Sequence, residues 1–206
     1  MRKIFIDCGA HDGCSIRKFR GAYMNASKYE IYSFEPNPAL AKFHPVSEDV
    51  KFFQKAVWIE DGQKTFYQVS KDKYGKTDAL TGASTLDEAK ARYNISRLNH
   101  QEHTKLVVET VDLSNWIMEE FSKEDYIVLK LDVEGSEYAI LDKMIADGSI
   151  KYIDHLFAEF HNIKCGKTLD QDEKIISVLR ELQIPYEEWD ALGYSYQAQA
   201  HINRKV

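Results

Sequence analysis

The stretch YIVLKLDVEG, residues 126–135, decides the fold class of this chain. Its apolar run is typical of a strand that is buried on both faces of a parallel sheet. Because side chains alternate along a strand, Lys130 and Asp132 lie on one face and the leucines beside them on the other. A lysine in the middle of so apolar a strand costs on the order of several kcal/mol unless a carboxylate pairs with it. The stretch therefore predicts a buried strand that carries a polar pair near its carboxyl end.

Strand patterns and helix patterns alternate on both sides of this stretch. Further strands are predicted at residues 3–8, 30–35, 50–58, 65–70, 106–111, 155–161 and 194–202. Helices are predicted around residues 16–23, 39–43, 113–121, 136–147 and 170–182. This order shows no repeat and no linker, so we expect one α/β domain over residues 1–206. Its sheet should be mostly parallel, with a binding crevice at the carboxyl ends of the strands.

One segment departs from this order. Residues 71–105 are polar, irregular and rich in charge, with a single helix predicted near residues 86–93. An insertion of this length in a compact domain is more often a cap or a binding loop than a neutral connector. We therefore expect an insertion or cap at about 71–105.

Composition argues against two classes of partner. The formal net charge of −6 disfavours a general nucleic-acid binder, which needs a surplus of lysine and arginine to neutralise phosphates. No segment approaches the roughly 20 apolar residues that a membrane helix needs. The amino terminus predicts a strand rather than a secretion signal. Three cysteines, an odd count without metal-site spacing, favour a reducing compartment, so we expect a cytoplasmic protein.

Two features at strand ends indicate a ligand. Gly9 and Gly13 follow the first strand four residues apart, and this spacing lets backbone N–H groups approach a ligand closely. It matches neither the dinucleotide fingerprint nor a P-loop. Glu35 ends the second strand, where a carboxylate is suited to a ribose diol. An ordinary turn and an ordinary exposed glutamate are the alternatives.

A third feature is a set of polar residues on two strands. If these strands are neighbours, Lys130, Asp132, Glu159 and His161 form one cluster, which is either catalytic or a structural ion network. His161 has the most suitable ordinary pKa for a general base, and Asp132 or Glu159 would serve if desolvated. Alternatively, Asp132, Glu159 and His161 hold a divalent cation, Mg²⁺ or Mn²⁺.

Taken in order, the motifs resemble a known family. IFIDCGAHDG, SFEPNP, KAVW, Ser84-Thr85, VETVDLSNWI and above all VLKLDVEGSEYAIL are similar to those of FkbM-type S-adenosylmethionine-dependent methyltransferases. The resemblance implies a three-layer, Rossmann-like class I fold with a seven-stranded sheet and an antiparallel last strand. It also implies O-methylation of a hydroxyl, most often on a sugar or glycan. His11-Asp12 departs from the usual asparagine and hydrophobic residue of the first turn.

The resemblance also assigns residues to S-adenosylmethionine. The methionine part would lie against the first turn, formed by Asp7, Gly9, Ala10, His11, Gly13 and Ser15. Glu35 would bind the ribose beside Pro36 and Asn37, and the adenine would lie near Ala56 and Val57. Asp132, Val133 and Glu134 would border the sulfonium and the acceptor. Ser84 and Thr85 would close over the site.

Three other function classes are weighed against this one. A nicotinamide oxidoreductase is disfavoured because the dinucleotide fingerprint is missing. A metal-dependent hydrolase would use the carboxylates and the histidine but leave the glycine turn and Glu35 without a role. A non-catalytic module that only binds a nucleotide or cofactor is the third. The expected partner is a small-molecule or glycan acceptor, and the oligomeric state is open.

Overall fold

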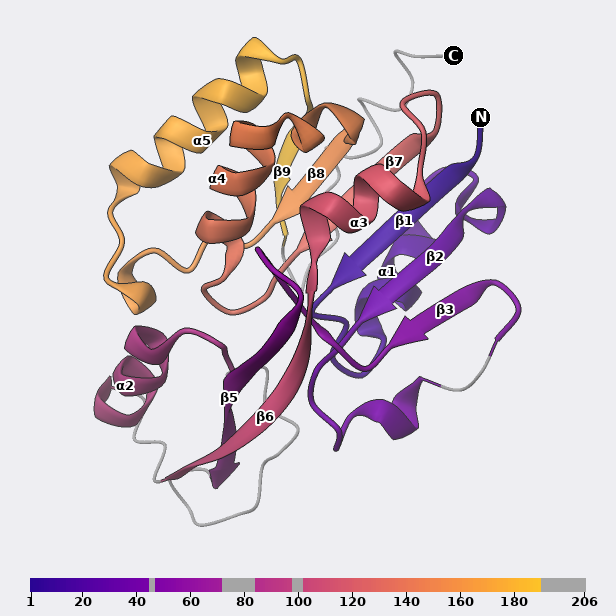
Figure 1. Ribbon diagram of the computed structural model, residues 1–206. Helices are drawn as coiled ribbons and strands as arrows, with labels where there is room; N and C mark the ends of the chain where they lie inside the picture. The colour runs from indigo at the N-terminus through magenta and orange to yellow at the C-terminus, as the bar shows by residue number, and fades with distance from the viewer. Residues whose placement is uncertain (45–46, 72–83, 98–101, 190–206) are drawn as a thin grey trace.

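The main sheet of the protein is parallel. The buried strand predicted within residues 126–135 lies in this sheet, next to the amino-terminal strand. The computed structural model describes residues 1–44, 47–71, 84–97 and 102–189 (Figure 1). Its sheet order is β3-β2-β1-β7-β8-β9, and every neighbouring pair runs parallel. The strands are β1 (Lys3–Cys8), β2 (Glu30–Phe34), β3 (Val50–Phe53), β7 (Tyr126–Leu131), β8 (His155–Ala158) and β9 (Tyr186–Glu188). An α/β fold on a mostly parallel sheet is thus confirmed.

The seven-strand prediction is met only in part. The described residues place six strands in this sheet, and β9, which was not predicted, pairs parallel with β8. The strand expected at 194–202 lies outside the described residues. The antiparallel last strand therefore stays a prediction.

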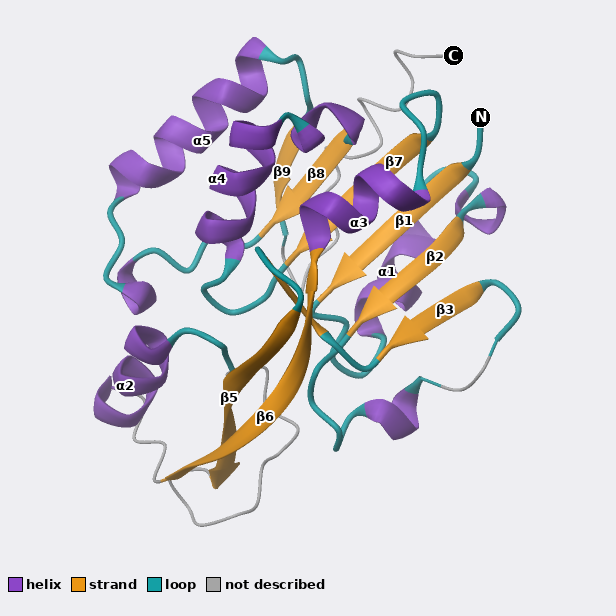
Figure 2. Cartoon of the chain, viewed as in Figure 1, coloured by secondary structure: helices purple, strands orange, loops and turns teal. Residues whose placement is uncertain are grey.

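Helices cover both faces of the sheet and give three layers (Figure 2). On one face, Phe19 of α1 (Cys14–Ala22) packs with Phe5 and Val128. On the other face, Ile117, Leu141 and Leu179 pack with the opposite side of the same strands. These residues belong to α3 (Leu113–Glu120), α4 (Glu137–Asp147) and α5 (Leu169–Glu181). Each buried side chain of this size contributes about 1.5–3 kcal/mol relative to an exposed one.

The predicted strand at 50–58 is wrong as a single element. Residues 50–53 form β3 beside β2, whereas β4 (Ala56–Trp58) belongs to a second sheet of order β4-β6-β5. Phe53 pairs with Phe34, the last residue of β2 before the Pro36 and Pro38 segment. Because a proline-rich segment offers few ladder donors, no described strand of the main sheet pairs with the chain after Phe53. It pairs instead with β6 (Glu102–Asp112).

The remaining elements lie close to their predicted places. The extra strand at 65–70 lies within β5 (Gly62–Lys71), and the helix of the insertion is α2 (Glu88–Arg97). Short 3₁₀ helices occur at η1 (Ala26–Lys28), η2 (Ala41–Phe43), η3 (Ser149–Tyr152) and η4 (Ile163–Cys165). The predicted strand at 155–161 is too long, because β8 ends at Ala158. Among the described residues, no helix has the length and apolarity to cross a bilayer.

Candidate active site

A cavity of about 270 Å³ lies at the carboxyl ends of β1, β2, β7 and β8. Residues of the second sheet and of the segment around Ser84 form its opposite wall. The site residues predicted from the sequence that line it are Gly9, His11, Ser15, Glu35, Pro36, Asn37, Ala56, Val57, Lys130, Asp132, Val133, Glu134 and Glu159. Four others, Asp7, Ala10, Gly13 and His161, lie outside this lining. Residues from five separate motifs thus meet around one cavity. This agrees with the expectation that a parallel sheet binds its ligand in a crevice at the carboxyl ends of its strands.

The first glycine turn is wedged between two strands. Gly9 has a left-handed φ of +80°, and a Cβ at this position would lie 1.9 Å from the backbone oxygen of Asp132. The N–H groups of Gly9 and Ala10 both donate to the Phe34 carbonyl at 3.0 Å. His11 also has a left-handed backbone, with φ of +51°. Only glycine fits at position 9, because any side chain would push the β1 and β7 ends apart.

Glu35 points its carboxylate at this turn. Its two oxygens accept the backbone N–H of His11 at 3.0 Å and that of Asn37 at 2.8 Å. The side chain is 7% exposed, and burial raises the pKa of Glu35 although the two amide bonds act in the opposite direction. Each carboxylate oxygen retains a further lone pair for a hydroxyl donor. The alternative of an ordinary exposed glutamate does not fit this burial.

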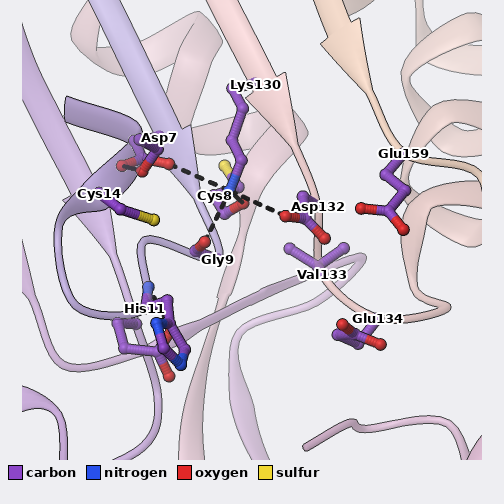
Figure 3. Close-up of polar contacts among 12 residues, drawn as sticks. Asp7, Cys8, Gly9, His11, Cys14, Lys130, Asp132, Val133, Glu134 and Glu159 are labelled. Carbon is purple, nitrogen blue, oxygen red and sulfur yellow. Dashed lines mark hydrogen bonds and ion pairs between the residues drawn. The ribbon is translucent and has the colours of Figure 1, made fainter. Parts of the chain in front are cut away.

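Lys130 is buried at the centre of the site (Figure 3). Its ammonium lies 3.3 Å from an Asp7 carboxylate oxygen and 3.5 Å from one of Asp132. It also donates to the carbonyls of Gly9 at 2.6 Å and Cys8 at 3.2 Å. Burial alone would lower the pKa of Lys130, but the carboxylates of Asp132 and Asp7 outweigh it and raise the pKa. Lys130 therefore ties the end of β7 to the glycine turn and stays charged.

Asp132 and Glu159 are two further carboxylates of the cavity wall, and both are candidates for proton removal. Asp132 follows β7 and Glu159 follows β8, and both line the cavity. Burial, and next the charge of Asp132, raise the pKa of Glu159. A carboxylate with a raised pKa that reaches a cavity is a good candidate to accept a proton.

The polar cluster predicted from the sequence consists of two groups that share Asp132, one around Lys130 and one around His161. Lys130 pairs with Asp7 and Asp132, whereas His161 contacts three glutamates. The Nδ1 atom of His161 lies 3.1 Å from Glu137, and its Nε2 atom lies 3.4 Å from both Glu134 and Glu159. His161 is only 2% exposed and does not line the cavity. Its role as a base stays a prediction, but the geometry places it behind Glu134 and Glu159.

Two residues of the second group were missed by the sequence reasoning. Glu137 accepts the backbone N–H groups of Val133 at 2.9 Å and Gly135 at 2.8 Å, and it is fully buried. It is the last acid of the EGSE motif, so its spacing to Glu134 was an available signal. Lys90 of α2 forms an ion pair with Glu134. It lies in the irregular segment, where no pattern marked it.

The predicted metal-ligand set is not the one that the fold assembles. Among the described residues, Asp132, Glu137 and His161 bring ligand atoms within 4.8 Å of one another. Glu159 does not belong to this group. The ammonium of Lys90 pairs with Glu134 next to the same group. A lysine already supplies positive charge there and would repel a divalent cation.

Comparison with known proteins adds a single match. A model of the methyltransferase FkbM domain matches residues 7–195. No curated protein and no solved structure matches the chain. The matched range includes every residue that lines the cavity. The resemblance expected from the motifs is confirmed, and the chain belongs to the FkbM methyltransferase family.

Proposed function

We propose that the protein is an S-adenosylmethionine-dependent O-methyltransferase that acts on a hydroxyl of a sugar or glycan. The observation that carries the proposal is the meeting, in one cavity, of the Gly9 turn, the Glu35 carboxylate and the Asp132–Glu159 pair. The first two suit a nucleoside cofactor, and the third suits proton removal. The choice of a hydroxyl on a sugar rests on the resemblance to the FkbM family.

The residues of the cavity fit this cofactor. When bound, S-adenosylmethionine supplies a reactive methyl group on a cationic sulfonium. The free lone pairs of Glu35 would accept the ribose hydroxyls, and the turn at Gly9 would hold the methionine part. Val57, Phe34 and Phe66 give apolar walls for the adenine. Asp132 and Glu134 place negative charge at the wall that would face the sulfonium.

The chain's contribution to the reaction is alignment and proton removal. Holding the acceptor oxygen in line with the methyl group supplies on the order of 7–11 kcal/mol. Glu159 would take the hydroxyl proton as the oxygen–methyl bond forms, and a general base adds roughly 10²–10⁴-fold. Asp132 shares the wall with Glu159 and is the second candidate for this role.

Glu35→Gln should weaken S-adenosylmethionine binding about 10- to 100-fold, since a hydrogen bond to a charged group contributes about 1.5–3 kcal/mol. The neutral amide also places an NH₂ group against one of two backbone N–H donors. Titration calorimetry measures the loss, with NAD titrated in parallel to test the oxidoreductase alternative. Glu30→Gln, at the other end of β2, is the matched control and should bind normally. Equal affinity of the Glu35 variant and the parent would contradict the assignment, and absence of binding by the folded parent would contradict the function.

Treatment with EDTA should leave cofactor affinity and methyl transfer unchanged. The physical reason is the ammonium of Lys90, which pairs with Glu134 beside the group of Asp132, Glu137 and His161 and would repel a cation there. The measurement compares chelated protein with protein supplied with Mg²⁺ or Mn²⁺. Activity that disappears on chelation and returns with one metal would restore the metal-assisted alternative.

A further inference from the structure

The Val133–Gly135 turn at the cavity has an unusual backbone. Glu134 has a φ of +58° and Gly135 one of +112°. A glutamate rarely adopts the left-handed region, and such a residue persists only where its surroundings fix it. Val133 and Glu134 line the cavity, so the conformation of this turn sets the shape of the wall that follows β7.

Two elements fix the turn from opposite sides. On one side, the buried Glu137 carboxylate of α4 accepts the N–H groups of Val133 and Gly135. On the other side, the Thr85 hydroxyl donates to the Glu134 carbonyl, and the ammonium of Lys90 pairs with the Glu134 carboxylate. Thr85 and Lys90 both belong to the segment 71–105, which the sequence predicts to be an insertion or cap.

The position of Lys90 is costly for stability. Its side chain is 1% exposed, and an ammonium removed from water loses more than one ion pair usually restores. An apolar pair of similar volume in place of Lys90 and Glu134 would often be equally or more stable. A buried lysine that pairs with a carboxylate of the cavity wall therefore indicates a role in the site.

We propose that Lys90 is a positioning residue: its ammonium holds the Glu134 carboxylate, and with it the Val133–Gly135 turn, in the shape that receives the cofactor. This inference rests on the proposed function. It places a determinant of the site on α2, outside the quoted motifs.

The charged surroundings of Lys90 give the proposal a pH signature. The titratable groups that face it are Glu134 of the turn, Asp132 after β7, Glu137 of α4, Glu159 after β8, and Lys164 and Cys165 of η4. Burial lowers the pKa of Lys90 to about 8, because the attraction of Glu137 and Asp132 offsets only part of the desolvation. Lys90 therefore loses its charge between pH 7 and 9.5, and its hold on Glu134 weakens in that range.

The test compares Lys90→Met, Lys90→Arg and the parent. Arg92→Met is the matched control, because Arg92 lies on the same helix and pairs with Glu88 in solvent. Titration calorimetry with S-adenosylmethionine is run at pH 7 and pH 9.5, together with thermal unfolding. At pH 7, Lys90→Met should stay folded and bind at least tenfold more weakly than the parent, although loss of one partner of the ion pair lowers its unfolding midpoint. Lys90→Arg should retain most of the affinity, and Arg92→Met should match the parent.

The pH series separates positioning from a merely structural role. Arginine keeps its proton at pH 9.5. At each pH, the affinity of Lys90→Arg is divided by the affinity of the parent, and this ratio removes the effect of any titration of S-adenosylmethionine itself. That ratio should rise at least threefold between pH 7 and 9.5. Parent-like binding by Lys90→Met would overturn the proposal. If Lys90→Met unfolds, the ratio of the Lys90→Arg affinity to the parent affinity decides. A ratio that stays constant between pH 7 and 9.5 would overturn the proposal, and a ratio that rises would support it. A folded parent that binds no S-adenosylmethionine at either pH would instead overturn the proposed function, and this inference with it.

Discussion

Gly9→Ala is expected to abolish S-adenosylmethionine binding, with a loss in affinity of at least about 100-fold. The added methyl would lie 1.9 Å from the Asp132 backbone oxygen and 2.9 Å from its carbonyl carbon. These are backbone atoms, so no side-chain rotation relieves the contact. The end of β7 must move, and the Asp132 N–H bond to the Cys8 carbonyl at 3.2 Å must break or lengthen. Overpacking of this kind costs about 1–3 kcal/mol, and the left-handed φ adds about 1–2 kcal/mol.

Gly13→Ala is the matched control for this variant. Gly13 has a similar φ of +77°, but the nearest heavy atoms to an added Cβ are 3.7 Å away. The control therefore carries the backbone strain without the collision, and it should lose only about 1–2 kcal/mol of stability while it still binds. Calorimetry and thermal unfolding of both variants distinguish the two effects. Equal binding losses at the two positions would show that backbone strain, rather than the contact with Asp132, governs the site.

Lys130→Met is expected to lower the free energy of unfolding by about 3–5 kcal/mol, the usual cost of breaking a buried ion pair. The substitution leaves the Asp7 carboxylate, which is 0% exposed, without its cation. It also removes the donor to the Gly9 and Cys8 carbonyls. Urea unfolding measures the loss. Lys143→Met is a suitable comparison, since the Lys143 ion pair with Asp112 is part-exposed and should contribute less, about 0–1 kcal/mol.

A second substitution identifies the cause of that instability. Adding Asp7→Asn removes the unpaired charge, so the double variant should recover a large part of the lost stability. Cofactor binding should not recover, because the Gly9 carbonyl still lacks its donor. A double variant as unstable as Lys130→Met alone would mean that packing of the lysine stem, rather than charge pairing, is the main contribution of Lys130.

The parallel sheet was predictable because its strands carry strong local patterns. The run at 126–131 forms β7 within the predicted bounds, and α3 begins at Leu113 as predicted, with Asp112 as its N-cap. The division of 50–58 between two sheets was not predictable in this way. No local pattern at Gln54 and Lys55 marks the break, which follows from where β2 ends and from a partner strand about fifty residues further on.

The cavity lining was predictable for a similar reason. Parallel strands place their carboxyl ends together, so the motifs at Gly9, Glu35 and Asp132 had to meet. Lys90 and His161 show the limit of this reasoning. Their partners come from elements whose relative placement is set by tertiary packing. The contact of Lys90 with Glu134 joins residues 44 positions apart and leaves no periodic trace in the sequence.

The backbone conformation of position 11 limits which residue types can occupy it. Glu35 accepts the backbone N–H of His11, a group that any residue except proline can supply. The φ of +51° is the actual constraint, and asparagine, aspartate and histidine are the side chains that tolerate it best. Histidine in place of the family's usual asparagine is thus an exchange within one tolerated set. Position 11 therefore tolerates a few residue types, whereas position 9, two residues away, accepts only glycine.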